Sequence, residues 1–308
     1  MNPFGETLAL PVAAALGALA LVLVGPGPLW VARWRFLYRV PRAAVLLWQA
    51  GTLSALISVF GAGVLVGVWA FGPDAPAPGR RPVWALVLAG VLVAFTLSVA
   101  VRLVWSLLAV GRTTAARRRH HLAAVDLLGE VGAQPDAGGL RVLAERLPIA
   151  YCLPGLRQSR VVLSSGTLAM LDSAEVAAVV AHETAHVRAR HDVVLDTFTA
   201  LHRAFPVVVR SELPERECRL LVEMLADDAA TRRVGPLPLA RALVALADSH
   251  VPATALGAGR TGTRLRVERL ARPPKGRTGL VAVAVYALAT GLVATPLLLL
   301  GLPWWLPG

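Results

Sequence analysis

The chain has few charged residues, few aromatic residues and almost no cysteine for its length. Of its 308 residues, 16% are charged and 6% are aromatic, whereas 56% are hydrophobic. A disordered chain is excluded, because it would be poor in apolar residues. Two cysteines, Cys152 and Cys218, are too few for a disulfide scaffold, and we expect both to be reduced thiols. The composition indicates an integral membrane protein.

The chain carries a formal net charge of +12, from 31 Lys and Arg against 19 Asp and Glu. Nucleic-acid binding is one explanation, but the basic residues are not interleaved with aromatic ones. Cations that mark the cytoplasmic side of a bilayer are the better explanation, because most hydrophobic residues lie in long runs. We therefore expect contact with a lipid bilayer and no direct contact with nucleic acid.

Four charge-free runs are long enough to cross a membrane, since a helix needs about 20 apolar residues for a hydrocarbon core of about 30 Å. We predict transmembrane helices over about residues 8–24, 43–71 and 83–103, and a fourth within 278–308. A Gly25-Pro26-Gly27-Pro28 breaker closes the first run. In the second, Gly63 and Gly67 have the GxxxG spacing that is typical of helix packing.

Basic residues flank these runs unevenly. They cluster after the first and third runs and before the fourth: Arg33, Arg35, Arg39, Arg42, Arg112, Arg117, Arg118, Arg119, Arg272, Lys275 and Arg277. Because positive residues favour the cytoplasmic side, the polar segment between the third and fourth runs should be cytoplasmic and both termini should face outward. This predicts a membrane domain over residues 1–111, a cytoplasmic domain over 112–277, and a last helix with a short outer tail over 278–308.

The cytoplasmic segment is expected to be mostly helical with a small sheet. Two short strands are predicted at residues 149–153 and 160–164, around a Pro-Gly turn. A long helix should begin near Asp172, which has capping-box spacing to Glu175, and end near Arg190. Other helices are predicted over about 117–131, 193–205, 214–232 and 238–247, with a mixed segment at 140–147. The fold class is therefore mainly α: a polytopic membrane protein with four transmembrane helices and a cytoplasmic α+β domain.

The long helix contains the sequence His182-Glu183-Thr184-Ala185-His186. Residues four apart share a helix face, so both imidazoles can bind one metal ion while Glu183 reaches a metal-bound water. With seven histidines and ten glutamates, an HExxH pattern should occur by chance about 0.005 times in such a chain. The apolar turn before the motif also argues against two solvated histidines. We predict a zinc site with Glu183 as the catalytic base.

A third protein ligand is needed, because catalytic zinc sites use three and keep one position for water. Glu223 is the best candidate, since it lies on a predicted helix with apolar neighbours, and Asp227 one turn later can accept a hydrogen bond from a ligating histidine. Glu217 and Asp228 are competing ligands. The alternative is an ordinary acidic helix face paired with neighbouring arginines.

Residues of about 150–230 resemble the gluzincin-type integral-membrane zinc peptidases. The matching segments are residues 150–155 (AYCLPG), 161–166 (VVLSSG), 171–175 (LDSAE) leading into AHETAH, and the ExxAD element at 223–227. The chain is most similar to the antirepressor family of penicillin-sensor transducers, and more distantly to the heat-shock membrane protease and CAAX prenyl protease family. The resemblance implies a zincin-like metallopeptidase domain with one zinc per chain, held by His182, His186 and Glu223, in a multi-pass protein of the bacterial plasma membrane.

The sequence departs from both groups of relatives. No antibiotic-binding domain is expected after the last span, although the transducers carry one. The histidine that heat-shock relatives often place before a terminal Arg-containing helix has no counterpart in residues 264–274. A residue that stabilises the oxyanion is therefore unassigned. The candidates, each expected to be structural instead, are Tyr151, His250, Arg264 and Arg266.

Structural roles are expected for the other histidines and for the cysteines. His120 and His121 should lie at the membrane interface, and His191 and His202 flank an apolar helix face that is typical of a core or membrane-facing surface. Neither cysteine is expected to be catalytic. The strand at 161–164 is the first candidate to pair with an extended substrate, and the neighbouring strand at 151–153 is the second.

Three functions fit these features. The first is a regulatory protease that inactivates a cytoplasmic repressor, for example one of the winged-helix type, when the membrane part senses a signal; the resemblance favours it. The second is a quality-control protease for damaged membrane proteins. The third is a non-catalytic membrane transducer with a structural zinc, which the intact Glu183 argues against.

Overall fold

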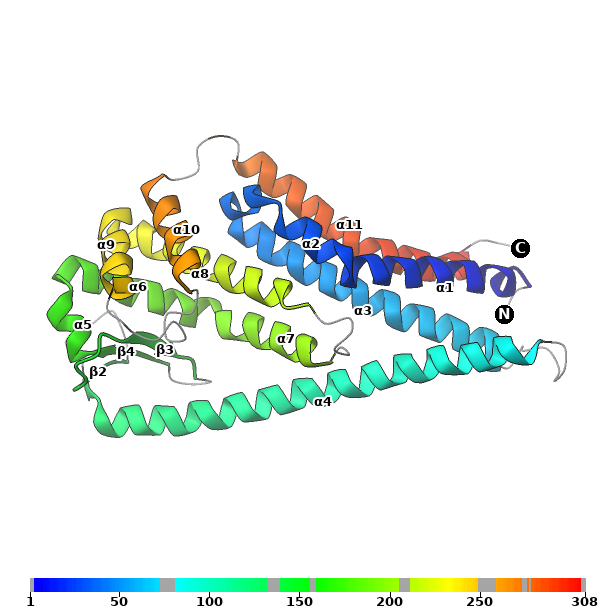
Figure 1. Ribbon diagram of the computed structural model, residues 1–308, viewed down its shortest axis with the longest axis horizontal. Coiled ribbons are helices and arrows are strands. Elements are labelled where there is room, and N and C mark those ends of the chain that lie inside the picture. The colour runs from blue at the N-terminus through cyan, green and yellow to red at the C-terminus, as the bar shows by residue number, and fades with distance from the viewer. Residues whose placement is uncertain are drawn as a thin grey trace. The chain divides into compact units, whose positions relative to one another are not determined.

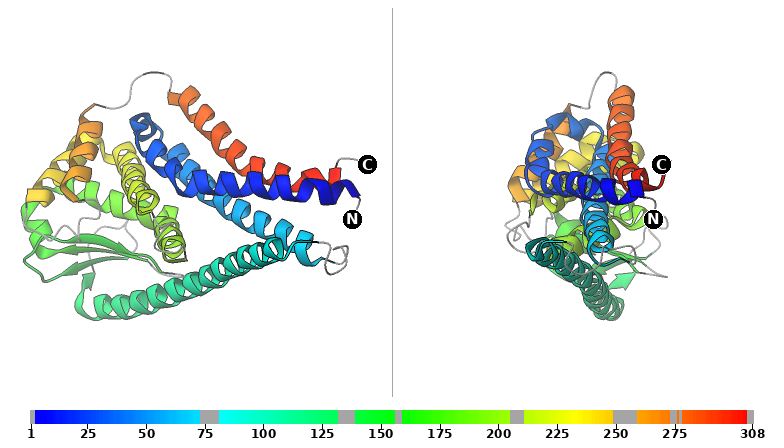
Figure 2. Two further views of the ribbon diagram at one scale, coloured as in Figure 1. Left: turned by 45° about the vertical axis from the view of Figure 1, so that its right-hand side comes forward. Right: turned by 90° about the vertical axis from the view of Figure 1, so that its right-hand side faces the viewer.

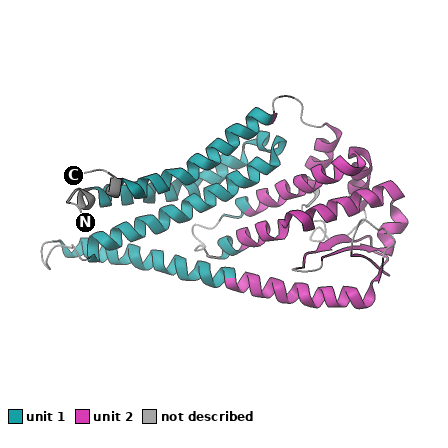
Figure 3. Ribbon diagram, turned by 180° about the vertical axis from the view of Figure 1, so that it is seen from behind, with its two compact units in different colours: residues 1–107, 200–214, 279–308 teal, residues 108–199, 215–278 magenta. Residues whose placement is uncertain are grey.

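The computed structural model describes residues 3–72, 81–131, 139–155, 159–204, 211–248, 259–272, 276 and 278–305. The chain divides into two compact units (Figure 3). The first comprises residues 1–107, 200–214 and 279–308, and the second comprises 108–199 and 215–278. Lys275, Arg277 and His250 lie outside the described residues.

The first unit consists of long apolar helices (Figure 1). Its main elements are α1 (Pro3–Val24), α2 (Pro26–Ala32), the 3-10 helix η1 (Arg35–Arg39), α3 (Pro41–Phe71), the first part of α4 (Val83–Leu128) and α11 (Thr278–Trp305). Among the described residues, α3, α4 and α11 are each long and apolar enough to cross a membrane. The pair α1 and α2 makes a fourth span only if the two are counted together, because they are bent by 45° at the predicted breaker.

The glycine pair of α3 packs against α4. A Cβ atom added at Gly63 would collide with the side chain of Thr96, and one at Gly67 would lie 3.4 Å from Val93. The predicted packing role of this pair is therefore confirmed. The helices α1, α3 and α4 also line a cavity of about 440 Å³, whose lining is apolar apart from Thr96. The residues that line it include no ionisable group.

The second unit contains a four-stranded sheet in the order β1-β2-β4-β3 (Figure 2). Its strands are β1 (Glu130–Val131), β2 (Leu140–Leu143), β3 (Ala150–Leu153) and β4 (Arg160–Ser164). Strand β2 is parallel to β4, and the other two pairings are antiparallel. The two predicted strands, β3 and β4, are thus confirmed. The expectation that β4 would pair with a substrate first is wrong, because β4 is already paired on both sides, whereas β3 is an edge strand of the described sheet.

Among the described residues, the second unit also contains the end of α4 and six further helices: α5 (Ser165–Met170), α6 (Ser173–Ala189), α7 (His191–Ala204, shared with the first unit at its end), α8 (Leu213–Val234), α9 (Pro236–Asp248) and α10 (Gly259–Ala271). The predicted capping box at the start of α6 is confirmed: Asp172 accepts a hydrogen bond from the Glu175 backbone, and the Glu175 side chain accepts one from Asp172. These two bonds satisfy backbone donors that a helix start otherwise leaves unpaired.

Helix α6 is the centre of this unit. Its residues Val176, Val179 and Val180 pack in one core cluster with β4 and α9. Its small residues Ala178 and Ala181 pack in a second cluster with α8, α9 and α10. Because both sides of its first turns are buried, α6 holds the HExxH turn that follows in a fixed place.

The sequence predictions differ from the structure at two helices. Residues 117–128 are helical as predicted, but they are the end of α4, which runs unbroken over 46 residues, and Glu130–Val131 is a strand. No proline interrupts this stretch, and Gly111 is tolerated within it. Helix α10 was not predicted, since its sequence contains Gly259 and Gly262 and lacks a continuous apolar stripe.

Candidate metal centre

Helix α6 presents both histidines of the HExxH motif on one face. Their Nε2 atoms lie 3.1 Å apart, and the two rings meet edge to face. The side chains of His182 and His186 are only 8% and 14% exposed. The pair is thus shielded from bulk water, which strengthens its interaction with any nearby charge.

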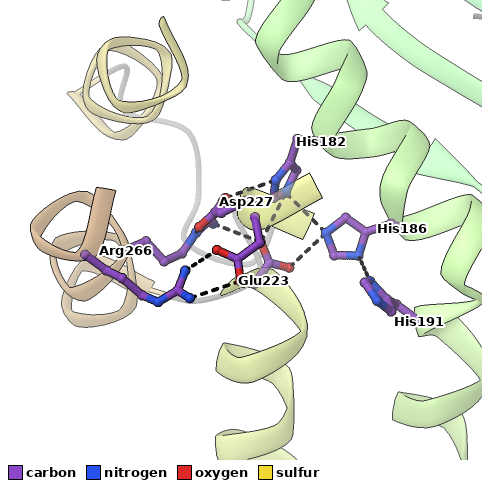
Figure 4. Close-up of polar contacts among 8 residues, drawn as sticks. His182, His186, His191, Glu223, Asp227 and Arg266 are labelled. Carbon is purple, nitrogen blue, oxygen red and sulfur yellow. Dashed lines mark hydrogen bonds and ion pairs between the residues drawn. The ribbon is translucent and has the colours of Figure 1, made fainter. Parts of the chain in front are cut away.

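Helix α8 brings Glu223 to this pair (Figure 4). Its Oε2 atom lies 3.4 Å from His182 Nε2, and its Oε1 atom lies 3.6 Å from His186 Nε2. Among the described residues, these three form a cluster able to hold a metal ion, with ligand atoms within 4.8 Å of one another. Of the competing candidates, Asp228 instead pairs with Arg269 at 2.5 Å, and Glu217 is not a member of the cluster.

The donor set fits a zinc ion in spacing. Zinc lies about 2.0–2.2 Å from nitrogen and oxygen ligands, and in a tetrahedral arrangement this places neighbouring donor atoms about 3.3–3.6 Å apart. The three observed separations of 3.1, 3.4 and 3.6 Å lie around that value.

The partners of the two Nδ1 atoms leave both Nε2 atoms facing each other. His182 Nδ1 lies 3.1 Å from Asp227 Oδ1, and His186 Nδ1 lies 3.1 Å from His191 Nδ1, while the two Nε2 atoms are 3.1 Å apart. A metal ion would bind the two rings in their neutral forms, with each proton on Nδ1 and both Nε2 lone pairs directed at the ion.

The charges around the cluster favour its metal-binding form. Burial, together with the charges of His182 and Arg266, lowers the pKa of His186 to about 4, so this ring is neutral at pH 7. Burial alone would raise the pKa of Glu223, but Arg266 and His182 lower it to about 2. His182 lies between two carboxylates, which raise its pKa to about 9 although burial opposes this. A metal must therefore displace a proton from His182.

Arg266 of α10 joins the carboxylates of the site. Its Nε and NH2 atoms donate hydrogen bonds to Asp227, and NH1 lies 2.8 Å from Glu223 Oε2. Arg266 is 3% exposed and Asp227 is 1% exposed. From the sequence, Arg266 is a weak candidate for oxyanion stabilisation that is expected to be structural instead, and its contacts with these two carboxylates agree with a structural role. It therefore positions Glu223 and Asp227.

The other oxyanion candidates lie away from the cluster or have other partners. The Tyr151 hydroxyl is 2.9 Å from His121 Nε2, so His121 lies against β3 of the second unit. Arg264 is exposed and pairs with Glu268 one turn along its own helix. Both of these partners, His121 and Glu268, lie outside the cluster.

Glu183, the proposed base, contacts the edge strand β3. Its carboxylate is close enough to the thiol of Cys152 for each group to shift the pKa of the other. Burial and the charge of Glu223 raise the pKa of Glu183 above its ordinary value, although His182 opposes the shift. Burial and Glu183 raise the pKa of the Cys152 thiol too, so this cysteine stays protonated, in line with the expectation that it is not a nucleophile. Its contact with Glu183 was not foreseen.

Comparison with known proteins adds one finding to this geometry. Residues 125–250 match the model of peptidase family M48. The match supports a zinc metallopeptidase. It includes the HExxH turn, Glu223 and Asp227, while Arg266 lies beyond it. No curated protein and no solved structure matches the chain.

Proposed function

We propose that the chain is a membrane-embedded zinc metalloendopeptidase that hydrolyses peptide bonds of a cytoplasmic or membrane-adjacent protein. One observation carries this proposal: the donor atoms of His182, His186 and Glu223 converge within 4.8 Å, and Glu183 stands on the same helical turn as the two histidines. The match to peptidase family M48 supports it. A purely structural zinc would have no use for Glu183.

The residues of the site have different roles in hydrolysis. A bound zinc ion would lower the pKa of its water ligand and polarise the scissile carbonyl. Glu183 takes the proton from the attacking water and later gives it to the leaving amine. Its raised pKa suits both steps, because a base must also release the proton it has accepted. Asp227 and Arg266 hold the histidine and the glutamate that bind the metal.

The edge strand β3 is the proposed docking strand for the substrate. It has an unpaired side in the described sheet, and an extended peptide can add to such an edge through backbone hydrogen bonds. Because Cys152 of β3 contacts Glu183, a peptide on this edge would run close to the base.

As the physiological substrate we propose a cytoplasmic transcriptional repressor of the winged-helix type, cleaved when the membrane part senses a signal. The support is the resemblance to the antirepressor family in the AHETAH and ExxAD segments. A bacterial plasma-membrane protein with its catalytic domain in the cytoplasm would have access to such a substrate.

The experiment is a comparison of cleavage in cells that contain either the wild-type chain or Glu183→Gln. Protein fragments that appear only with the wild type identify the substrate. Cleavage of a repressor encoded next to this gene would support regulated proteolysis. Fragments of many heat-damaged membrane proteins would support quality control instead, and no difference between the two chains would contradict the proposed peptidase.

A further inference from the structure

The two histidines of the metal cluster are held by different partners. His182 Nδ1 faces the carboxylate of Asp227 at 3.1 Å. His186 Nδ1 faces another imidazole, the Nδ1 atom of His191, also at 3.1 Å (Figure 4). The two rings meet almost at a right angle, with centroids 4.9 Å apart. His191 is therefore placed next to the Nδ1 atom of His186 in the same way as Asp227 is placed next to the Nδ1 atom of His182.

This geometry fixes the hydrogen bond between the two rings. His186 can bind a metal through Nε2 only if its Nδ1 carries the proton, and that proton then points at His191 Nδ1. Residues that accept such a hydrogen bond set the orientation and tautomer of a ligating histidine. His191 is 6% exposed, so little water competes for the bond.

The turn between α6 and α7 places His191 at this position. Helix α6 ends at Arg190, whose φ of 51° lies in the left-handed region that side chains other than glycine rarely adopt. Helix α7 begins at the next residue, His191, so the chain folds back and returns an imidazole to the ring of His186.

An arginine of α4 holds the start of α7. Arg118 donates one hydrogen bond to Asp192 at 2.7 Å and another to Asp196 at 2.9 Å. These carboxylates lie one turn apart on α7, so a single guanidinium fixes the direction of the first helical turn. Asp192 is adjacent to His191 and its side chain is only 10% exposed.

We propose that His191 is a positioning residue for the zinc ligand His186, and that Arg118 positions His191 by holding the first turn of α7. The inference rests on the proposed function, because it requires a metal at the cluster. Arg118 lies on the same unbroken helix that begins as an apolar span at Val83. Through Arg118 and the first turn of α7, this helix therefore contributes to the orientation of one metal ligand.

The test is zinc affinity, measured by competition with a chelator on the purified full-length protein. His191→Ala should lower the affinity about 10- to 100-fold, the usual effect of losing a residue that orients a ligating histidine. His191→Asn should recover most of the loss, since its amide oxygen can accept the bond from His186. His202→Ala removes an imidazole of the same helix whose Nδ1 atom lies 3.3 Å from the Ser211 backbone oxygen, and it should leave the affinity unchanged.

Arg118→Ala should lower the affinity less than His191→Ala, because Arg118 acts through another residue. Its matched control is Arg119→Ala, which removes an exposed arginine that bonds to the backbone of its own helix. If Arg118 acts through His191, the double variant should bind zinc no more weakly than His191→Ala alone. Multiplicative losses in the double variant would overturn this role of Arg118.

The absorption spectrum of the cobalt-substituted protein gives a second readout, because it reports the geometry around the metal. His191→Ala should change the spectrum, and His191→Asn should return it toward that of the wild type. Wild-type affinity together with a wild-type spectrum in His191→Ala would overturn the inference while leaving the proposed peptidase intact. A wild-type protein that binds no zinc would overturn both.

Discussion

Arg266 and Asp227 form a buried bidentate ion pair, in which the guanidinium donates from Nε at 2.8 Å and from NH2 at 2.7 Å. The same guanidinium reaches Glu223, so one residue of α10 holds both carboxylates of the proposed metal centre. The buried charge of Asp227 and the partly buried charge of Glu223 can coexist here because the buried Arg266 cation pairs with both.

Replacing Arg266 by alanine should strongly destabilise the folded chain. Removing one partner of a buried ion pair typically costs about 3–5 kcal/mol, because the remaining charge is left without compensation. Chemical denaturation of the full-length protein in detergent measures the free energy of unfolding. The control is Arg264→Ala, two residues away on the same helix but exposed, which should not change the denaturation midpoint. Equal midpoints for both variants would contradict the structural role of Arg266.

One zinc ion per chain is the second prediction. His182→Ala or His186→Ala should abolish stoichiometric zinc binding, since each removes one of three proposed protein ligands. Metal analysis of the purified protein gives the result, with His202→Ala as a control that keeps the cluster. The proposed site is wrong if the double variant of His182 and His186 retains full zinc.

Glu223→Gln should weaken zinc binding without abolishing the fold, because a neutral amide is a poorer ligand than a carboxylate. The matched control is Glu215→Gln on the same helix, where the carboxylate pairs with Arg219 instead. A chelator competition on both variants separates them. Equal affinities would assign the third ligand to another residue.

Parts of this site could be predicted from sequence because they depend on local periodicity. The HExxH spacing puts two histidines on one helix face, and the capping box marks where that helix begins. From the sequence, Glu223 could be chosen as the third ligand only because it is the best acidic residue on a second helix with apolar neighbours. Its approach to the histidines depends on how α6 and α8 pack, which no local pattern specifies.

The roles of Arg266 and His191 could not be predicted in the same way. Arg266 lies 39 residues from Asp227, on a helix whose sequence gives a weak helical signal. His191 reaches His186 only because Arg190 takes a left-handed conformation, and an arginine gives no sign of such a turn, as a glycine would. The unbroken course of α4 was missed because its apolar and polar halves look like separate helices.

Membrane orientation is a further prediction from the arginine distribution. Reporter fusions after residues 73, 111 and 308 should read outside, inside and outside. The basis is the cluster of cations that follows the third run and the cluster that precedes the fourth. An extracytoplasmic reading after Gly111 would place the metal centre on the other side of the membrane and exclude a cytoplasmic substrate.

The central claim, that this metal centre hydrolyses peptides with Glu183 as the base, is tested most directly by Glu183→Gln. The substitution keeps the volume of the side chain and leaves His182, His186 and Glu223 in place. The loss of a general base typically lowers the rate about 10²- to 10⁴-fold. Because Glu183 also donates a proton to the leaving amine, the decrease in rate should approach the upper figure. The measurement is cleavage of a candidate repressor or a membrane-tethered peptide, alongside zinc content. The account predicts normal zinc content with the substrate left uncut, and cleavage at the wild-type rate would contradict it.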